Sequence, residues 1–289
     1  MANLKEIRSR IKSVKNIQKV TKAMKMVAAA KLRKSQENME KARPYENRLK
    51  KLIGHLIKDV DSKTFDLLRA KTEVNTIGFV IVTADRGLAA SFNTNIIKKA
   101  EKEIKSIGKD NAKLICIGKK GYEYFEKRGY NVIHHYVDFW SDLKFDIATN
   151  IGINIKDYFL SNTVDTVKVI FNYFKNVATQ EVIYETLLPF TIHTSKEEER
   201  EVFTDIIFEP SKEQLLNILI PKHLNTQIWK YLLESFASEQ GARMVAMENA
   251  TENAGDMISD LTLEFNKARQ TAITTEMLEI VGGAEALSN

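Results

Sequence analysis

Proline and glycine are scarce in this sequence. Its 289 residues include only 4 Pro and 12 Gly, so few turns are encoded and long secondary-structure elements are expected. Cysteine is rarer still, because Cys116 is the only one. An intramolecular disulfide is therefore excluded, and the apolar run around Cys116, LICIG, predicts a small buried side chain in a protein of the reducing cytoplasm.

Long apolar runs are also missing. No stretch of about eighteen consecutive apolar residues occurs, so no membrane-spanning helix is predicted. The first residues, MANLKEIRSR, are charged and amphipathic, unlike the continuous apolar core of a secretory signal. They resemble an organelle transit peptide in being basic and poor in acids, but this pattern continues over about fifty residues and is interpreted as mature protein.

The motifs of common catalytic and cofactor sites are absent as well. The first predicted strand ends in VTADRGLAASFN, which contains neither a dinucleotide-binding glycine motif nor a P-loop; a tight turn is the simplest interpretation of Asp85, Arg86 and Gly87. The five histidines have no metal-binding spacing, and adjacent His134 and His135 would point to opposite faces of a strand. We therefore predict no catalytic residue, no metal and no cofactor.

What the sequence does contain is a strong separation of charge. Residues 1–58 hold 17 Lys and Arg against 4 Asp and Glu, whereas residues 222–289 hold 5 against 10. The two ends of the chain would attract each other if they packed together. The basic end alone could instead suit nucleic acid or an anionic membrane.

Both ends have the apolar spacing of coiled-coil helices. In residues 3–58 the apolar positions are Leu4, Ile7, Ile11, Val14, Ile17, Val20, Met24 and Val27, a seam with one three-residue stammer. Pro44 is expected to kink this helix rather than split it. In residues 211–287, Pro221 suits the first turn of a helix, and the seam is Ala254, Ile258, Leu261, Phe265, Ala268 and Ala272.

The middle of the chain changes rhythm. Between residues 76 and 194, β-branched and aromatic runs alternate with helical patterns, which predicts a Rossmann-like α/β domain with a mostly parallel sheet of about five strands. The last two runs are separated only by KNVATQ and should form an antiparallel hairpin. The expected division is a helix in 1–60, an α/β domain in 74–205 and a helix in 210–289, with the two helices in an antiparallel coiled coil.

Three blocks of the sequence resemble a known family. LKEIRSRIKSVKNIQKVTKAMKMVAAAKLRKSQ, TADRGLAASFN and ARMVAMENATENAGDMISDLTLEFNKARQTAITTEMLEIVGGAEAL together look like the gamma subunit of F-type ATP synthase. The resemblance implies a non-catalytic rotor subunit, one per complex. Its coiled coil would turn inside three alpha and three beta subunits, and its foot would sit on the membrane c-ring beside epsilon. No targeting segment is evident, so a peripheral location on the cytoplasmic side of a bacterial plasma membrane is expected.

The resemblance also implies roles for individual residues. Coupling contacts with beta would come from Arg269, Gln270, Thr274, Met24 and Lys25, whereas Glu239 and Arg243 would interact with the first helix. The foot would include Phe208 and Glu209, and the apolar bearing tip would be Met277, Leu278, Ile280, Val281 and Leu287. Two pairs of residues depart from the family pattern. Ala89-Ala90 stands where Cys-Gly is usual, which matters if position 90 needs a positive φ. Gln240-Gly241 stands where His-Ala is common, and a glycine inside a helix costs about 1 kcal/mol relative to alanine.

Two other functions remain open at this point. One is a basic coiled coil that binds nucleic acid, which is disfavoured because Tyr45 is the only aromatic residue in 1–58 and no base-stacking platform exists. The other is an α/β enzyme with a helical oligomerisation arm, which saturable turnover by the isolated chain would support.

Overall fold

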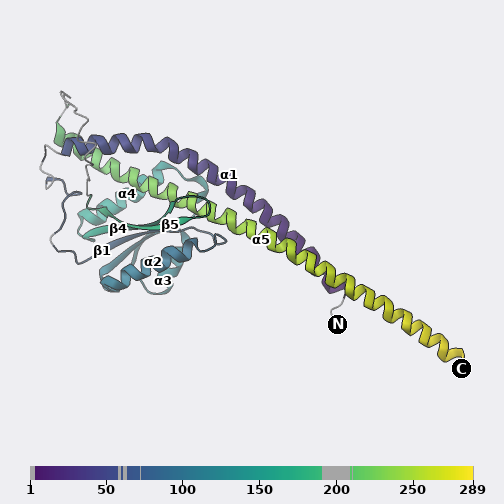
Figure 1. Cartoon of the computed structure of the whole chain (residues 1–289). Coiled ribbons are helices and arrows are strands. Elements are labelled where there is room, and N and C mark those ends of the chain that lie inside the picture. The colour runs from purple at the N-terminus through teal and green to yellow at the C-terminus, as the bar shows by residue number, and fades with distance from the viewer. Residues whose placement is uncertain are drawn as a thin grey trace. The chain divides into compact units, whose positions relative to one another are not determined.

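The computed structural model of the chain describes residues 4–57, 60, 64–71, 73–190, 209 and 211–288, with side chains as far as Ala284. Packing groups these residues into two units, one made of residues 1–28 and 244–289 and the other of residues 29–243. Helices α1 (Leu4–Leu56) and α5 (Lys212–Ser288) contribute to both units (Figure 1). These two units are not the three segments expected from the sequence, 1–60, 74–205 and 210–289, and that division stays a prediction.

The larger unit contains an α/β sheet. Within the described residues five strands pair in the order β3-β2-β1-β4-β5: β1 (Ile77–Val82), β2 (Ala112–Ile117), β3 (Val132–Tyr136), β4 (Thr166–Phe174) and β5 (Gln180–Leu188). The first four are parallel, and β4 and β5 form the predicted antiparallel hairpin. Every side chain of β1 is buried, as expected for a parallel strand covered on both faces.

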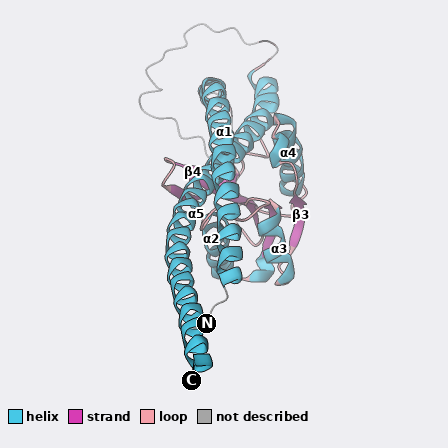
Figure 2. Ribbon diagram, turned by 90° about the vertical axis from the view of Figure 1, so that its right-hand side faces the viewer, coloured by secondary structure: helices cyan, strands magenta, loops and turns pink. Residues whose placement is uncertain are grey.

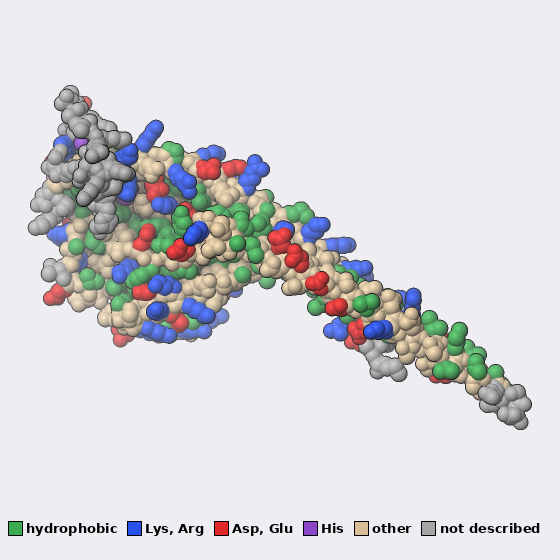
Figure 3. Space-filling view, in the orientation of Figure 1, with side chains coloured by type: hydrophobic (Ala, Val, Ile, Leu, Met, Phe, Trp, Pro, Cys, Tyr) green, Lys and Arg blue, Asp and Glu red, His purple; other side chains and the backbone are tan. Residues whose placement is uncertain are grey.

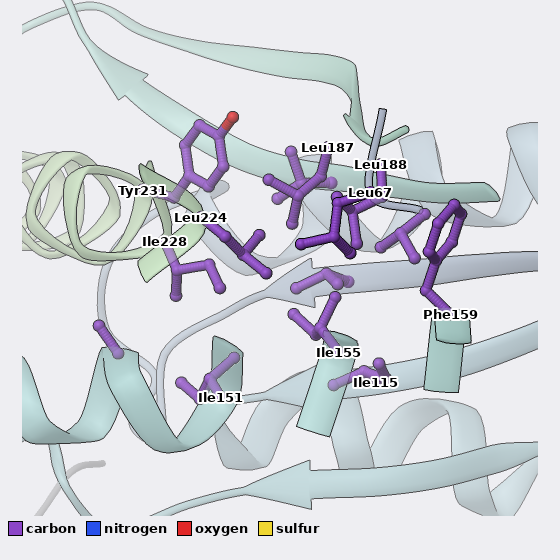
Figure 4. Packing of buried hydrophobic residues seen from close by; sticks show 14 of the residues in the cluster. Leu67, Ile115, Ile151, Ile155, Phe159, Leu187, Leu188, Leu224, Ile228 and Tyr231 are labelled. Atoms are coloured by element: carbon purple, nitrogen blue, oxygen red, sulfur yellow. The ribbon is translucent and has the colours of Figure 1, made fainter. Parts of the chain in front are cut away.

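Helices cover both faces of this sheet (Figures 1 and 2). On one face, α2 (Phe92–Ile107) and α3 (Lys119–Lys127) pack on Phe79, Ile81 and Leu114. On the other, α4 (Phe145–Leu160), the end of α1 and the start of α5 build a larger core with Val80, Ile115 and Val169. Figure 4 shows part of that core, where Leu224, Ile228 and Tyr231 of α5 lie near Leu187, Leu188, Ile151 and Ile155. Short 3-10 helices lie at Lys109–Asn111 and Trp140–Asp142.

One structural contact fastens the start of the sheet. The Asp165 carboxylate accepts hydrogen bonds from the backbone N–H groups of Asn75 (2.9 Å) and Thr76 (2.8 Å) and pairs with the Lys71 ammonium at 2.8 Å. The Lys71 hydrogen bond, together with the two amides, lowers the pKa of Asp165 below its ordinary value. The segment before β1 is thereby fixed to the start of β4.

Two expectations about prolines meet different outcomes. The first helix is continuous through Pro44, so it is not split there. The prediction for Pro221 was wrong: α5 begins at Lys212, and Pro221 lies well inside it rather than in its first turn. The reason is burial, since Leu216 and Ile220 belong to the larger core, and their packing offsets the backbone hydrogen bond that proline cannot donate.

The coiled-coil seam was predicted correctly on α5 and wrongly on part of α1. On α5, Ala254 is buried and Ile258, Leu261, Phe265, Ala268 and Ala272 are half-buried between exposed neighbours. On α1, Ile17, Val20 and Val27 are 53–58% exposed, whereas Thr21 and Ala28 are buried in the seam. The observed positions 7, 14, 21 and 28 keep an uninterrupted heptad, so the helix avoids the overwinding that a stammer would require.

Candidate functional site

The loop after β1 lies at the carboxyl ends of the parallel strands, where α/β folds commonly place their sites. Its anchor is Asp85, whose two carboxylate oxygens accept hydrogen bonds from the backbone N–H groups of Lys119 and Asp138, each at 2.8 Å. These groups open α3 and follow β3. Asp85 therefore fastens the loop to two neighbouring connections, and both of its oxygens already have backbone partners.

The backbone of this loop is strained. Leu88 and Ala90 have φ values of 61° and 46°, in the left-handed region that costs an L-residue about 1–2 kcal/mol. The concern raised by Ala90 in place of glycine is thus justified: position 90 does adopt a positive φ. Asn93 supports the turn, because its side-chain oxygen accepts from the Ala84 N–H (2.9 Å) and its amide donates to the Arg86 carbonyl (3.3 Å).

Close packing at the end of β2 adds a further constraint. Gly118 has a φ of 96°, and a β-carbon there would lie 2.0 Å from the Thr83 carbonyl oxygen. The Thr83 hydroxyl in turn accepts from the Gly121 N–H at 2.9 Å. By contrast, a β-carbon on Gly87 would meet no atom within 4 Å. The strand ends are therefore filled by the chain itself, while the loop tip is open.

Helix α5 reaches this loop through Arg243. The guanidinium donates to the Gly87 carbonyl at 3.0 Å and pairs with Glu239 one turn earlier. Both side chains are buried, and burial raises the pKa of Glu239, an effect that Arg243 and Lys31 of α1 partly offset. The sequence placed this pair against the first helix; the hydrogen bond that Arg243 makes outside α5 goes to the β1–α2 loop.

Gly241 explains why α5 can approach so closely. A β-carbon at this position would lie 3.2 Å from the ring of Phe174, which is tighter than usual side-chain contact. Nearby, the Ser238 hydroxyl donates to the Asn172 carbonyl (3.2 Å), and the Glu234 carboxylate accepts from the Phe174 N–H (3.0 Å). Sequence reasoning missed Asn93, Asn172 and Glu234 because their partners include backbone groups, which residue types do not reveal; for Asn172 and Glu234 the partner is also at least 60 residues away along the chain.

The coiled-coil unit has its own cross-helix contacts. Lys25 forms an ion pair with Glu248, and the Arg8 guanidinium lies 5.4 Å from the ring centre of Phe265. Met24, the neighbouring candidate, is half-buried. Lys25 thus has a partner within the chain and is not a free surface charge.

The candidates near the end of α5 are exposed. Arg269, Gln270 and Thr274 all face solvent, and the Thr274 hydroxyl donates only to the Gln270 carbonyl of its own helix (2.9 Å). Beyond them, Met277, Leu278, Ile280 and Val281 are 62–72% exposed, and Figure 3 shows hydrophobic side chains gathered over this end of the helix. Such a run of uncovered apolar side chains is typical of a surface that meets another protein.

The remaining candidates fall partly outside the described residues. Phe208 and most of the segment 205–210 lie outside them, and Glu209 is exposed. Leu287 belongs to α5, but its side chain is not among those described. The predicted foot and the last residue of the tip therefore stay predictions.

Neither a metal centre nor a reactive thiol is found in the part of the chain that is described. No cluster of His, Cys, Asp or Glu able to hold a metal occurs there, and none of its helices is long and apolar enough to cross a membrane. His134 contacts Tyr158 of α4 and His135 stacks on Tyr122 of α3, so the two rings do point to opposite faces. Burial raises the pKa of Cys116 to about 12.

Comparisons with known proteins agree from end to end. The family model described as ATP synthase matches residues 3–287. The chain is 47% identical to the ATP synthase gamma chain of Chlorobium phaeobacteroides (strain DSM 266) and 48% identical to that of Prosthecochloris aestuarii, with 99% of each chain covered in both pairs.

Solved structures show the same fold. A chain of the central stalk and c-ring of the Tetrahymena thermophila mitochondrial ATP synthase matches with a TM-score of 0.63 and 25% identity, over 80% of this chain and 99% of that one. A chain of the Euglena gracilis mitochondrial enzyme matches with a TM-score of 0.69 and 21% identity, over 98% and 94%.

Proposed function

This chain belongs to the ATP synthase gamma-chain family, and from that premise we propose how it serves the complex. It is the central rotor subunit, one per complex, and it couples ion flow through the membrane ring to conformational change at the beta subunits. It carries no catalytic residue of its own. The observation that carries the proposal is the uncovered apolar end of α5, on a chain that matches gamma chains over 99% of its length.

The exposed end of α5 suits a shaft held in a sleeve. Apolar side chains from Met277 to Val281 offer few hydrogen-bond donors or acceptors, so they can slide against a partner without specific adhesion. Leu287 extends the same surface in the sequence. Without a surrounding partner, these side chains would face water at a cost of about 25 cal/mol per Å² of apolar area.

Specific contacts belong one to three turns earlier on α5. Arg269 is exposed and can form a forked pair with a carboxylate of beta, while Gln270 and Thr274 add neutral hydrogen bonds. On α1, Met24 and Lys25 contribute at the level of the Lys25–Glu248 pair. These contacts form and break as the coiled coil rotates, so the rotation has discrete positions at which the subunit binds beta.

The α/β unit provides the attachment for the other partners. Its base, through Phe208 and Glu209, meets the membrane c-ring beside epsilon, and the complex lies on the cytoplasmic side of a bacterial plasma membrane. The Arg243 guanidinium holds α5 to the β1–α2 loop through the Gly87 carbonyl, and Asp85 fastens that loop to the start of α3. The relatives reported above are ATP synthase chains, which gives the nucleic-acid alternative no support.

Reconstitution tests this function. The chain purified with alpha and beta subunits should yield a complex that hydrolyses ATP, and the chain alone should not. Adding epsilon and the membrane ring should then make proton pumping dependent on this chain. An assembled complex that couples equally well without it would refute the proposal, as would tight, salt-sensitive DNA binding without assembly.

A further inference from the structure

Helix α1 carries two faces that compete for the coiled-coil seam between Val14 and Ala28. The face that the structure uses contains Thr21 and Ala28. The other contains Ile17, Val20, Met24 and Val27, spaced like a heptad seam themselves. Judged by apolar side chains alone, the second face is the better seam, because Ile17, Val20 and Val27 carry more apolar area than Thr21 and Ala28. Something other than hydrophobic area therefore selects the first.

A hydroxyl pair spans the helices on the selected face. Thr21 Oγ1 and Thr251 Oγ1 are 2.7 Å apart, and the Thr251 hydroxyl donates to the Met247 carbonyl at 2.7 Å. The Gln18 amide donates to the Thr251 carbonyl at 3.4 Å. Thr251 is thus contacted from α1 through both its side chain and its backbone, and the hydroxyl contact needs Thr21 to point at α5.

We propose that Thr21 and Thr251 are positioning residues that fix the rotational phase of α1 in the coiled coil. A polar residue at a seam position specifies one arrangement at some cost in stability. In the alternative phase Thr21 would lose its cross-helix partner and keep only the Gln18 carbonyl of its own helix, to which its hydroxyl also donates at 3.1 Å. If Thr21 loses its partner, the segment from Val14 to Ala28 overwinds toward the apolar face. Ile17, Val20 and Val27 then turn inward and Ala28 turns outward.

The consequence for the complex rests on the proposed rotor function. The hydroxyl pair keeps three apolar side chains on the outer surface of α1, where subunits surrounding the shaft would meet them. The phase itself is a property of the chain alone. It can therefore be measured without assembly, and its failure is distinguishable from a failure of the rotor function.

Thiol labelling of the full-length chain measures the phase. The only native cysteine, Cys116, is completely buried, so Val20→Cys and Ala28→Cys give separate reporters, one exposed and one buried. Each is compared in three backgrounds: native, Thr21→Ala with Thr251→Ala, and Thr21→Ser with Thr251→Ser. The serine and alanine pairs differ only in the hydroxyl groups.

The expected result is a reciprocal change. In the alanine background, maleimide labelling should slow at Val20→Cys and accelerate at Ala28→Cys. One hydrogen bond changes the ratio of the two phases by about fivefold, so labelling of the buried reporter should accelerate by about threefold to fivefold and labelling of the exposed reporter should slow by less than about twofold. The serine background should behave as the native one. In the assembled complex, coupled ATP synthesis should fall with the alanine pair and recover with the serine pair.

Other outcomes overturn the inference. Unchanged labelling in the alanine background would show that the hydroxyl groups do not select the phase. Equal changes in the serine background would assign the effect to the methyl groups. Acceleration at both reporters would indicate loosening of the coil rather than rotation, and helix content from circular dichroism would confirm that reading.

Discussion

Replacing Arg243 by methionine should destabilise the α/β unit strongly. The change removes the hydrogen bond to the Gly87 carbonyl and leaves the buried Glu239 carboxylate without its cation. A charged hydrogen bond contributes about 1.5–3 kcal/mol, and breaking one side of a buried ion pair costs about 3–5 kcal/mol. The two overlap, so the free energy of unfolding at pH 8 should fall by about 3–5 kcal/mol.

The loss in free energy of unfolding caused by Arg243→Met should depend on pH, and its direction follows from the pKa of Glu239. Burial already raises the pKa of Glu239 in the folded protein. The protonated group therefore stabilises the fold fully at pH values below its unfolded pKa, and this contribution is lost as pH rises through its folded pKa. Without Arg243 the folded pKa rises further. The deficit should therefore shrink by at least about 1.4 kcal/mol between pH 8 and pH 5, the equivalent of one pH unit for one proton.

Urea unfolding followed by tryptophan fluorescence measures this effect. The chain has 2 Trp, and both Trp140 and Trp229 lie in residues 29–243, so the signal reports the α/β unit and not the coil. The matched control combines Arg243→Met with Glu239→Gln, which removes the uncompensated charge and should recover most of the loss. A deficit below about 1 kcal/mol, or a double variant as unstable as the single one, would refute the reasoning.

Three further changes test other contacts. Gly118→Ala should lower the free energy of unfolding by more than about 3 kcal/mol in the same assay, because the new β-carbon would lie 2.0 Å from a backbone oxygen at a positive φ. Gly87→Ala, where the β-carbon meets open space, should change it by no more than about 0.5 kcal/mol, and similar losses in both variants would contradict this. Asp165→Asn should lower the free energy of unfolding by about 1–3 kcal/mol at pH 7. Since the folded pKa of Asp165 is lowered, the native chain should lose its stability advantage over the variant as pH falls below about 4, the unfolded pKa. A stability difference that grows toward acidic pH would be inconsistent with this. Arg269→Ala should lower coupled ATP synthesis in the assembled complex without preventing assembly. Lys267→Ala, which changes an exposed basic neighbour, should leave synthesis unchanged. Normal synthesis and pumping with Arg269→Ala would rule out the proposed contact between Arg269 and beta.

The sequence predicts those parts of the fold that depend on local periodicity. The strands, the hairpin and the α5 seam follow from runs and spacings that physical packing preserves. The α1 seam does not, because apolar spacing cannot weigh the hydroxyl contact between Thr21 and Thr251, residues far apart in the chain. Pro221 misled for a similar reason: its local signal is overridden by tertiary burial of the residues before it.

The candidate site shows the same division. The loop at Asp85 and the pair Glu239–Arg243 could each be singled out from the sequence, but their meeting could not, since the link runs from a side chain to the Gly87 carbonyl. Backbone acceptors leave no trace in residue types. The apolar end of α5, by contrast, could be predicted from the sequence, because it consists of closely spaced apolar residue types near the end of a helix.

The coiled coil joins the two ends of the chain, and this has a consequence for biosynthesis. Lys25 and Glu248 are separated by 223 residues, so at about 5–20 residues per second the ribosome needs about 11–45 s to supply the partner of the first helix. During that time the seam of α1 has nothing to pack against. Its 17 basic residues in 1–58 against 4 acidic ones make nascent copies repel each other, which should keep neighbouring chains on a polysome from pairing before the acidic α5 emerges.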